Sequence, residues 1–556
     1  MKVRRKRRYQ PIEPDEILID AQNLPGYDAS RLEGRIERPI DENVYRFFIL
    51  VIVLVGLVFF LQLGKLQVLD AANLQRHAES NRLHQTTIIA ERGKITDRNG
   101  EALALNEPDE QAGFSKRYYP LGEAAAHIVG YVSYPKKDPN GYWVQESVEG
   151  RFGIEQAFEQ RLLGENGVEI QETTAVGETL SGSTIRVPVP GDEVALSLDA
   201  GLQKELYNLI AKQAKEASFI GGSGAVIDIR TGELFALVSY PSFDSNILAN
   251  GEDADTIAAY STDTRSPYLD RAVAGLYTPG SVVKPFVALA ALEEEVITPE
   301  KSILSTGSIS IPNPYNPNLS SVFRDWKAHG WVNMRQALAV SSDVYFYEIG
   351  GGFENQKGLG ISTIEKWMLR FGFGNDTGSL LSGEASGVIP TPQWKAETFD
   401  GEDWFLGNTY HTAIGQYGFQ ATTLQLARAT AALANGGILI TPTIEKGSVT
   451  DKESLKIDER NVRVVREGMR LAVTEGTAQA LNLEGLTVAG KTGTAEVGAR
   501  KEFVNSLIVG FFPYENPQFA FAVIMERAPA GASGAPMVMR HLLEWIQTHR
   551  PSMVGS

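Results

Sequence analysis

The sequence contains no cysteine, and methionine and histidine are scarce. Its 556 residues include 8 Met and 7 His. The lack of cysteine excludes disulfide bonds, a thiol nucleophile and a zinc site with cysteine ligands. It is also compatible with an exported protein, although it does not establish export.

Positive charge is also in short supply over the whole chain. Lys and Arg number 52 against 68 Asp and Glu, which gives a formal net charge of −16 at pH 7. This balance argues against general nucleic-acid binding. With 43% hydrophobic and 22% charged residues, the chain is typical of a folded protein. Its length exceeds that of one typical domain.

One long apolar run lies near the N-terminus. Residues 47–63 contain a single polar residue, Gln62, and these 17 residues reach the lower length limit of a membrane-spanning helix. A buried core helix is the alternative, but it would normally carry polar residues on one face. A basic cluster within residues 2–8 precedes the run, and no small-residue cleavage site follows it. We therefore expect a retained single-pass anchor in the cytoplasmic (inner) membrane, with the N-terminus cytoplasmic and the rest on the outer, periplasmic face.

Turn signals divide the rest of the chain. Asn99-Gly100 predicts a hairpin among the short elements that follow the anchor, and Pro190-Gly191-Asp192 indicates a boundary. The expected parts are a basic cytoplasmic tail (1–46), a transmembrane helix (47–63), a mixed pedestal module (64–190) and a large C-terminal domain (191–556).

The C-terminal domain has strands at both ends and helices between them. We expect a helix at 200–217, a hairpin of strands 224–229 and 233–239, and mainly helices over 281–435 interrupted by a loop at 305–332. Further strands are expected at 486–495, 505–512 and 518–526, followed by an amphipathic helix at 535–548. This order predicts an α+β fold, an antiparallel sheet with a helical insertion.

Ser281-Val282-Val283-Lys284 is a candidate nucleophile motif. Pro279 and Gly280 form a turn before it, and an apolar helical run follows. Serine and lysine three residues apart share one helical face, so a neutral Lys284 could take the proton of Ser281. The spacing alone is weak evidence, because Ser133-Tyr134-Pro135-Lys136 has it too.

Two further motifs follow Ser281. Ser341-Ser342-Asp343 places hydroxyls and a carboxylate at the expected start of a helix, where such residues also serve as N-caps. Similar Ser-x-Asp triplets begin at Ser197, Ser242 and Ser261, so this match is weak alone. Lys491-Thr492-Gly493-Thr494 is more specific: it follows a predicted strand and could bind a carboxylate, while Gly493 permits close backbone approach.

In the order Ser-x-x-Lys, Ser-x-Asp, Lys-Thr-Gly, the three motifs resemble those of the penicilloyl-serine transferases, which include penicillin-binding proteins and serine β-lactamases. Arg92-Gly93-Lys94-Ile95-Thr96-Asp97-Arg98-Asn99-Gly100 resembles the pedestal signature of the class B penicillin-binding proteins. Four further segments resemble the penicillin-binding protein 2 branch, which serves cell elongation: Arg324-Asp325-Trp326, residues 341–347, Ile414-Gly415-Gln416 and Thr423-Leu424-Gln425-Leu426-Ala427.

This resemblance implies a β-lactamase/transpeptidase-like domain and a D,D-transpeptidase that cross-links peptidoglycan stem peptides. Ser281 would form an acyl-enzyme with release of D-Ala, Lys284 would be the base, and Ser341 would pass a proton to the leaving group. Asp343 would help to position the groups, and Lys491, Thr492, Gly493 and Thr494 would bind substrate. β-Lactams would acylate Ser281. The implied partners are a SEDS-family glycosyltransferase and other elongation proteins, and no cofactor is implied.

Some features depart from the family pattern, and other functions stay open. Asn505-Ser506-Leu507 stands where many members have a His-Ala-Trp-like stretch, and Tyr417-Gly418 follows Gln416 where relatives often have glycine directly. Asp325 and His329 could contribute to a metal site, but without a cysteine ligand we expect no metal. The alternatives are a D-Ala-D-Ala carboxypeptidase, a β-lactamase-like hydrolase, or a penicillin-binding sensor or scaffold without turnover.

Overall fold

The computed structural model describes residues 41–75, 83–139, 143–173, 179–313, 316–498, 500, 502–532 and 534–555. The chain divides into two compact units. One comprises Met1–His84 with Glu172–Leu180, and the other comprises Gln85–Gln171 with Ser181–Ser556.

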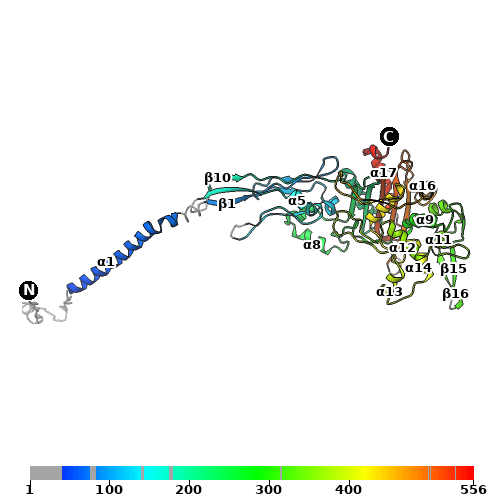
Figure 1. Cartoon of the computed structure of the whole chain (residues 1–556), viewed down its shortest axis with the longest axis horizontal. Helices are drawn as coiled ribbons and strands as arrows, with labels where there is room; N and C mark the ends of the chain where they lie inside the picture. Colours follow the sequence, from blue (N-terminus) through cyan, green and yellow to red (C-terminus); the bar gives the residue numbers. More distant parts are fainter. Residues whose placement is uncertain are drawn as a thin grey trace, which may run out of the picture. The chain divides into compact units, whose positions relative to one another are not determined.

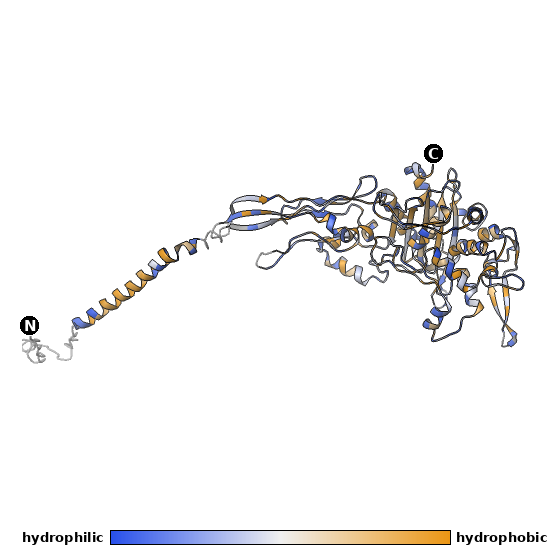
Figure 2. Cartoon of the chain, in the orientation of Figure 1, coloured by the Kyte–Doolittle hydropathy of each residue, from blue (hydrophilic) through white to orange (hydrophobic). Residues whose placement is uncertain are grey.

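The first unit contains helix α1 (Glu42–Gly64), which continues as a short π-helix at Lys65–Leu69. The side chain of Asp41 caps the first turn by accepting a hydrogen bond from the Asn43 amide. Figure 2 shows hydrophobic colour along most of α1, and none of its residues is buried. Among the described residues, this is the one helix long and apolar enough to cross a membrane. The expected span, 47–63, lies inside it.

The second unit begins with small sheets. A four-stranded sheet has the order β11-β2-β3-β4, with β11 at Val194–Ala195, β2 at Ile95–Thr96, β3 at Ala102–Glu107 and β4 at Lys116–Tyr118. β2 and β3 are antiparallel and flank Asn99-Gly100, so the predicted hairpin is present. Another sheet, most of whose residues belong to this unit, has the order β1-β9-β10, with β1 at Leu83–Ile88, β9 at Gly167–Thr173 and β10 at Thr179–Arg186. Helices α4 (Gly153–Ala157) and α5 (Glu159–Leu162) follow one another directly.

A five-stranded antiparallel sheet forms the centre of the C-terminal domain. Its order is β13-β12-β22-β21-β20, with β12 at Gly221–Asp228, β13 at Leu234–Tyr240, β20 at Ala489–Val497, β21 at Phe503–Phe512 and β22 at Phe519–Pro529. Segments nearly 300 residues apart are therefore neighbours, since β12 pairs with β22 along its whole length. β20 is an edge strand, which leaves alternate backbone groups unpaired within the sheet.

Helices bury both faces of this sheet. α6 (Ala200–Ala217) and α17 (Ala535–His549; labelled in Figure 1) pack on one face, and α15 (Thr423–Ala434) packs on the other. Successive residues of β12 alternate between the two hydrophobic clusters: Ala225 and Ile227 join one, and Val226 joins the other. The α+β fold class predicted from the sequence is confirmed.

The segment between the strands is mainly helical, as predicted. It contains a 3₁₀ turn at Gly280–Val283 and helices α9 (Lys284–Glu293), α10 (Met334–Val340), α11 (Asp343–Gly351), α12 (Ile361–Arg370), α13 (Pro392–Thr398), α14 (Leu406–Ala413) and α16 (Glu459–Thr474).

The prediction of a loop at 305–332 was wrong. β15 (Ser308–Asn313) and β16 (Asn316–Arg324) form an antiparallel ribbon there, and β14 (Ile303–Ser305) pairs with β17 (Gly330–Val332). The Ser-, Asn- and Pro-rich composition is typical of a loop, but the backbones of the two strands pair with one another, which composition does not report.

Candidate active site

Ser281 lies in the 3₁₀ turn before α9, where the chain passes close to β20. A Cβ on Gly493 would lie 2.9 Å from the carbonyl oxygen of Pro279, and one on Gly280 would lie 3.0 Å from that of Thr494. Gly280 also has a φ of 56°, a conformation that favours glycine. Glycine at these two positions lets the nucleophile turn and the Lys-Thr-Gly strand meet at backbone distance.

Lys284 is fully buried and faces Ser341 and Asp343. Its Nζ donates to the Ser341 carbonyl at 2.9 Å, to Ser341 Oγ at 3.3 Å and to Asp343 Oδ1 at 2.6 Å. Within the described chain no hydrogen bond joins Lys284 to Ser281 Oγ, although both occupy the same turn. In this arrangement the lysine is bonded to the Ser-x-Asp motif.

Ser341 connects two helices and two lysines. It ends α10 in a left-handed conformation with a φ of 60°, and Ser342 then caps α11. Ser341 Oγ accepts from Lys284 and also from Lys491 Nζ at 2.8 Å. A hydroxyl has two acceptor lone pairs and one hydrogen. Because both lysines donate to it, the hydroxyl hydrogen of Ser341 is left for another acceptor.

Lys491 is buried completely in β20. Burial, and then the charge of Lys284, hold the pKa of Lys491 well below its usual value. Besides Ser341, its ammonium donates to the Thr492 carbonyl at 2.9 Å. These bonds fix the position of the amine between the sheet and the Ser-x-Asp motif.

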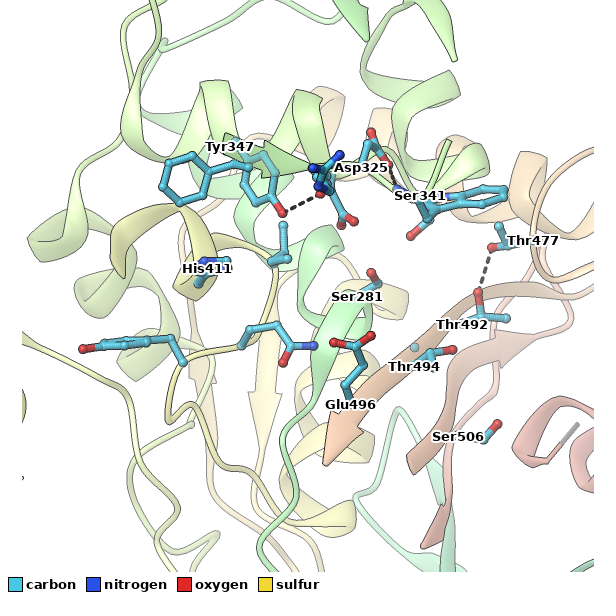
Figure 3. A pocket seen from close by; sticks show the side chains of 18 of the residues that line it. Ser281, Asp325, Ser341, Tyr347, His411, Thr477, Thr492, Thr494, Glu496 and Ser506 are labelled. Atoms are coloured by element: carbon cyan, nitrogen blue, oxygen red, sulfur yellow. Dashed lines mark hydrogen bonds between the residues drawn. The ribbon is translucent and has the colours of Figure 1, made fainter. Parts of the chain in front are cut away.

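Strand alternation separates the Lys-Thr-Gly motif into two rows. Lys491 and Gly493 point to the buried side of β20, whereas Thr492 and Thr494 are partly or fully exposed on the other side. Thr492 donates to Thr477 Oγ1 at 2.7 Å. The two threonine hydroxyls therefore line an open surface beside Ser281, as Figure 3 shows.

These groups meet in a cavity of about 1060 Å³. Of the predicted catalytic and substrate-binding residues, Ser281, Ser341, Asp343, Thr492, Gly493 and Thr494 line it, and Lys284 and Lys491 lie behind its wall through their bonds to Ser341. Its remaining walls are formed by Val322, Phe323, Arg324, Asp325, Trp326, Tyr347, His411, Ile414, Gln416, Tyr417, Thr477, Glu496, Ser506, Ala532, Gly534 and Pro536. The sequence departures at Tyr417 and Ser506 thus both face the cavity.

Asp325 is a site residue whose role the sequence did not predict. Its fully buried carboxylate accepts from Ser342 Oγ at 2.8 Å, from the Val344 amide at 3.0 Å and from Ser305 Oγ at 3.1 Å. Burial acts to raise the pKa of Asp325, but these hydrogen bonds outweigh it and lower the pKa. Asp325 thereby ties the ribbon to the first turn of α11. The motif Arg324-Asp325-Trp326 was the available signal, but it carries no information about these partners.

A metal site receives no support from the described side chains, among which no group of three His, Asp or Glu is arranged to hold an ion. His329 Nε2 lies 3.5 Å from Asp325 Oδ1, and these two are the only pair suggested by the sequence. The absence of a metal stays a prediction.

The competing motifs lie outside the cavity. Ser133 and Lys136 belong to two short strands, β5 (Val132–Ser133) and β6 (Lys136–Lys137). The aspartates of two other Ser-x-Asp triplets, Asp199 and Asp244, cap α6 and α7 (Ser245–Asn250). Their capping role is the one that serine and aspartate commonly have at helix starts.

A serine at the start of a helix, two buried lysines that share a second serine, and threonines on an edge strand define a serine acyl-transfer site. The sequence comparisons agree with this class. Residues 222–544 match the penicillin binding protein transpeptidase domain, and residues 114–196 match the penicillin-binding protein dimerisation domain. The chain therefore belongs to the penicillin-binding protein transpeptidases, in the penicillin-binding protein 2 branch.

Similar proteins extend over most of the chain. Peptidoglycan D,D-transpeptidase MrdA of Acinetobacter baumannii is 34% identical over 79% of this chain and 67% of its own length. MrdA of Escherichia coli K12 is 31% identical over 84% of this chain and 77% of its own. The crystal structure of Pseudomonas aeruginosa PBP2 superposes with a TM-score of 0.68 at 34% identity, and it covers 83% of this chain and 98% of its own.

Two structures of assemblies are also similar. Helicobacter pylori PBP2 in complex with MreC has a TM-score of 0.70 at 27% identity, over 84% of this chain and 99% of its own. A chain of a peptidoglycan synthase complex has the same TM-score and identity, over 93% of this chain and 99% of its own.

Proposed function

We propose that this protein is a peptidoglycan D,D-transpeptidase of cell elongation that works through an acyl-enzyme on Ser281. The observation that carries the proposal is the position of Ser341, whose hydroxyl is held by both Lys284 and Lys491 in the cavity that contains Ser281. Family membership and the names of the relatives support the same reaction.

In the acylation step, Ser281 Oγ attacks the carbonyl carbon of the penultimate D-Ala of a stem peptide. In its unprotonated form, Lys284, three residues after Ser281 at the start of α9, takes the proton of Ser281, whereas in the resting site this lysine is the ionic partner of Asp343. The amide C–N bond then breaks, and the terminal D-Ala leaves as an amine that needs one proton. Ser341 supplies this proton, because its hydroxyl hydrogen is not directed at either lysine. Lys284 then passes to Ser341 the proton that it took from Ser281.

The negative charge of this step falls where the site has donors. The carbonyl oxygen would lie near the backbone N–H groups of Ser281 and Thr494, which belong to the start of a helix and to an edge strand. The hydroxyls of Thr492 and Thr494 and the charge of Lys491 would receive the terminal carboxylate. Gly493 contributes by allowing β20 to approach the turn.

In the second step, an amine from a neighbouring stem attacks the acyl-enzyme, forms the cross-link and returns a proton to Ser281. Water in place of the amine would give a carboxypeptidase or a β-lactamase-like hydrolase. A scaffold would give neither product. β-Lactams acylate Ser281 in the same way and are released slowly.

The test uses the detergent-solubilised full-length protein. A fluorescent penicillin is expected to label the wild type and not Ser281→Ala, with label recovered on Ser281 by mass spectrometry. Next, a D-Ala-D-Ala stem mimic is added with and without an acceptor amine. Amide product above the hydrolysis product supports the transpeptidase; hydrolysis alone would assign the protein to the carboxypeptidases, and absence of label would overturn the proposal.

The anchor and the domain division belong to the same proposal. Single-pass anchoring agrees with the apolar helix and with the MrdA relatives. We place the tail (1–46) in the cytoplasm, the span at 47–63, and the pedestal (64–190) and transpeptidase domain (191–556) on the periplasmic face, because the basic residues precede the span. Protease added to intact spheroplasts should cleave residues after the span and leave an N-terminal epitope intact; the reverse pattern would contradict this orientation.

Partners follow from the similar assemblies. One relative binds MreC, and another belongs to a peptidoglycan synthase complex. We propose that this chain assembles with other elongation proteins and that a SEDS-family glycosyltransferase contacts the anchor and pedestal. Replacing the anchor by an unrelated apolar span should reduce co-purification of that glycosyltransferase while penicillin labelling persists. Unchanged co-purification would count against the assignment.

A further inference from the structure

Arg324 is a charged residue of the cavity wall that the proposed mechanism does not use. Among the described residues that line the cavity, Arg324 is the one with a permanent positive charge. Asp343 is paired with Lys284, and the carboxylate of Asp325 is buried in its hydrogen bonds. The guanidinium of Arg324 makes no hydrogen bond or ion pair within the described chain, and the residue is exposed.

The ribbon holds Arg324 at the cavity wall. Its Cα is paired with Ser308 in the β15–β16 register, and its carbonyl accepts from Tyr347 Oη at 3.1 Å. The ring of Phe323 packs 5.0 Å from that of Tyr410, and its two neighbours in the strand, Val322 and Arg324, line the cavity with it. A fixed backbone thus presents a solvated guanidinium next to the site.

We propose that Arg324 binds a second carboxylate of the donor stem peptide, on a side chain upstream of the scissile D-Ala-D-Ala bond. A planar guanidinium with five donors is suited to a carboxylate, whereas the first carboxylate of the donor is assigned to the Lys-Thr-Gly strand. The inference rests on the transpeptidase function proposed above. It predicts that stems with a free side-chain carboxylate are better donors than amidated stems or stems with only an amine at that position.

The charge on one side of Ser281 favours this placement. Asp325 follows Arg324 in the sequence, and Tyr347 donates a hydrogen bond to the Arg324 carbonyl. Figure 3 shows Asp325 and Tyr347 on one side of Ser281, with Thr494 and Glu496 on the other. A carboxylate near Arg324 would meet an opposite charge. The cavity volume of about 1060 Å³ also exceeds what a dipeptide fills.

The test compares benzylpenicillin with carbenicillin, which differ by one carboxylate on the acyl side chain. Second-order rates of acylation are measured on the solubilised full-length wild type and on Arg324→Gln, Arg324→Lys and Arg463→Gln. Arg463 is exposed on α16 and does not line the cavity. Donor peptides with a free or amidated third-residue carboxylate provide a second series.

In Arg324→Gln we expect the carbenicillin-to-benzylpenicillin rate ratio to fall about five- to tenfold, as for one solvated charge-assisted hydrogen bond. Benzylpenicillin should react within about twofold of the wild-type rate. Arg324→Lys should recover part of the ratio, Arg463→Gln should leave it unchanged, and 0.5 M salt should shrink the wild-type difference.

The outcomes separate the two proposals. An unchanged ratio in Arg324→Gln, together with equal use of free and amidated donor peptides, would overturn the role of Arg324 while leaving the transpeptidase intact. Failure of benzylpenicillin to acylate the wild type would instead contradict the proposed transpeptidase function itself. A melting temperature equal to that of wild type confirms that the variant folds.

Discussion

The Nζ atom of Lys284 lies 2.6 Å from Oδ1 of Asp343, with the lysine side chain fully buried and the carboxylate 18% exposed. This pair joins the first turn of α9 to the first turn of α11. Ser341, two residues before Asp343, is also hydrogen-bonded to Lys284. The position of the proposed base therefore depends on a carboxylate 59 residues away in sequence.

Replacing this carboxylate should disturb both stability and chemistry. Asp343→Ala leaves the buried Lys284 without its ionic partner, and we expect a loss of about 3 kcal/mol in unfolding free energy. Asp343→Asn keeps an acceptor oxygen and should lose less. Urea unfolding and the rate of penicillin acylation measure the two effects. Equal stability of wild type and Asp343→Ala would show that the pair does not contribute.

Lys491 should show the opposite relation between stability and activity. Burial and the charge of Lys284 lower the pKa of Lys491. The folded protein therefore binds this proton less tightly than the unfolded chain does, which destabilises the fold at pH values below the usual lysine pKa. This destabilisation diminishes as the pH rises toward that value. Lys491→Met should therefore gain about 1–2 kcal/mol at pH 7 and less at pH 9.5, while acylation falls about 100-fold or more. Unfolding at the two pH values, with acylation rates, checks both. A variant that is less stable than wild type at pH 7 would contradict the destabilising role of the buried charge.

Glu348, on α11, predicts a pH dependence near neutrality. Burial, and then the charge of Glu354, raise its pKa from 4.5 to about 7, and the residue is 9% exposed. The folded state thus holds an extra proton between these values, so the contribution of Glu348 to stability is fully present below pH 4.5 and is lost as the pH rises through about 7. The shift corresponds to about 3 kcal/mol.

Glu348→Gln removes this loss. It should be more stable than wild type by about 2–3 kcal/mol at pH 8 and nearly equal at pH 5, as measured by urea unfolding. Glu354→Gln should give a smaller gain at pH 8, because it removes the second cause of the shift. A difference between wild type and Glu348→Gln that is the same at both pH values would refute this account.

The pedestal depends on one buried carboxylate. Glu155 accepts from Arg92 Nε at 2.6 Å and from Arg117 Nε at 2.7 Å, and the side chains of all three are at most 1% exposed. Tyr119 Oη adds a bond of 3.3 Å. Without the glutamate, two buried arginines lose an ionic partner. This lowers the free energy of unfolding, because the protein interior solvates charge poorly.

We expect Glu155→Ala to destabilise the pedestal by about 3–5 kcal/mol. Hydrogen exchange should then accelerate at Arg92, Arg117 and their neighbours, with the exposed Glu110→Gln as a matched control. Penicillin labelling of Ser281 should persist, because neither Glu155 nor the three side chains bonded to it line the cavity. Unchanged exchange at Arg117 would falsify the proposed role of Glu155.

The sequence by itself determined the anchor, the main strands and helices of the C-terminal domain, and the order of the three motifs. These are local properties. The run at 47–63 lacks the polar face of a core helix. Strands such as β12 and β21 are buried at successive positions because helices cover both faces. Ser281, Ser341 and Lys491 could be selected because their surrounding motifs follow the order of a known family.

Tertiary structure decided the rest. Ser281 and Ser133 have the same spacing to a lysine, and only Ser281 lies against an edge strand in a cavity. The two hydrogen bonds to Ser341 Oγ join residues 57 and 150 positions apart, and Asp325 reaches α11 from a ribbon whose composition predicted a loop. Such contacts depend on backbone pairing and packing between distant segments, which no window of sequence contains.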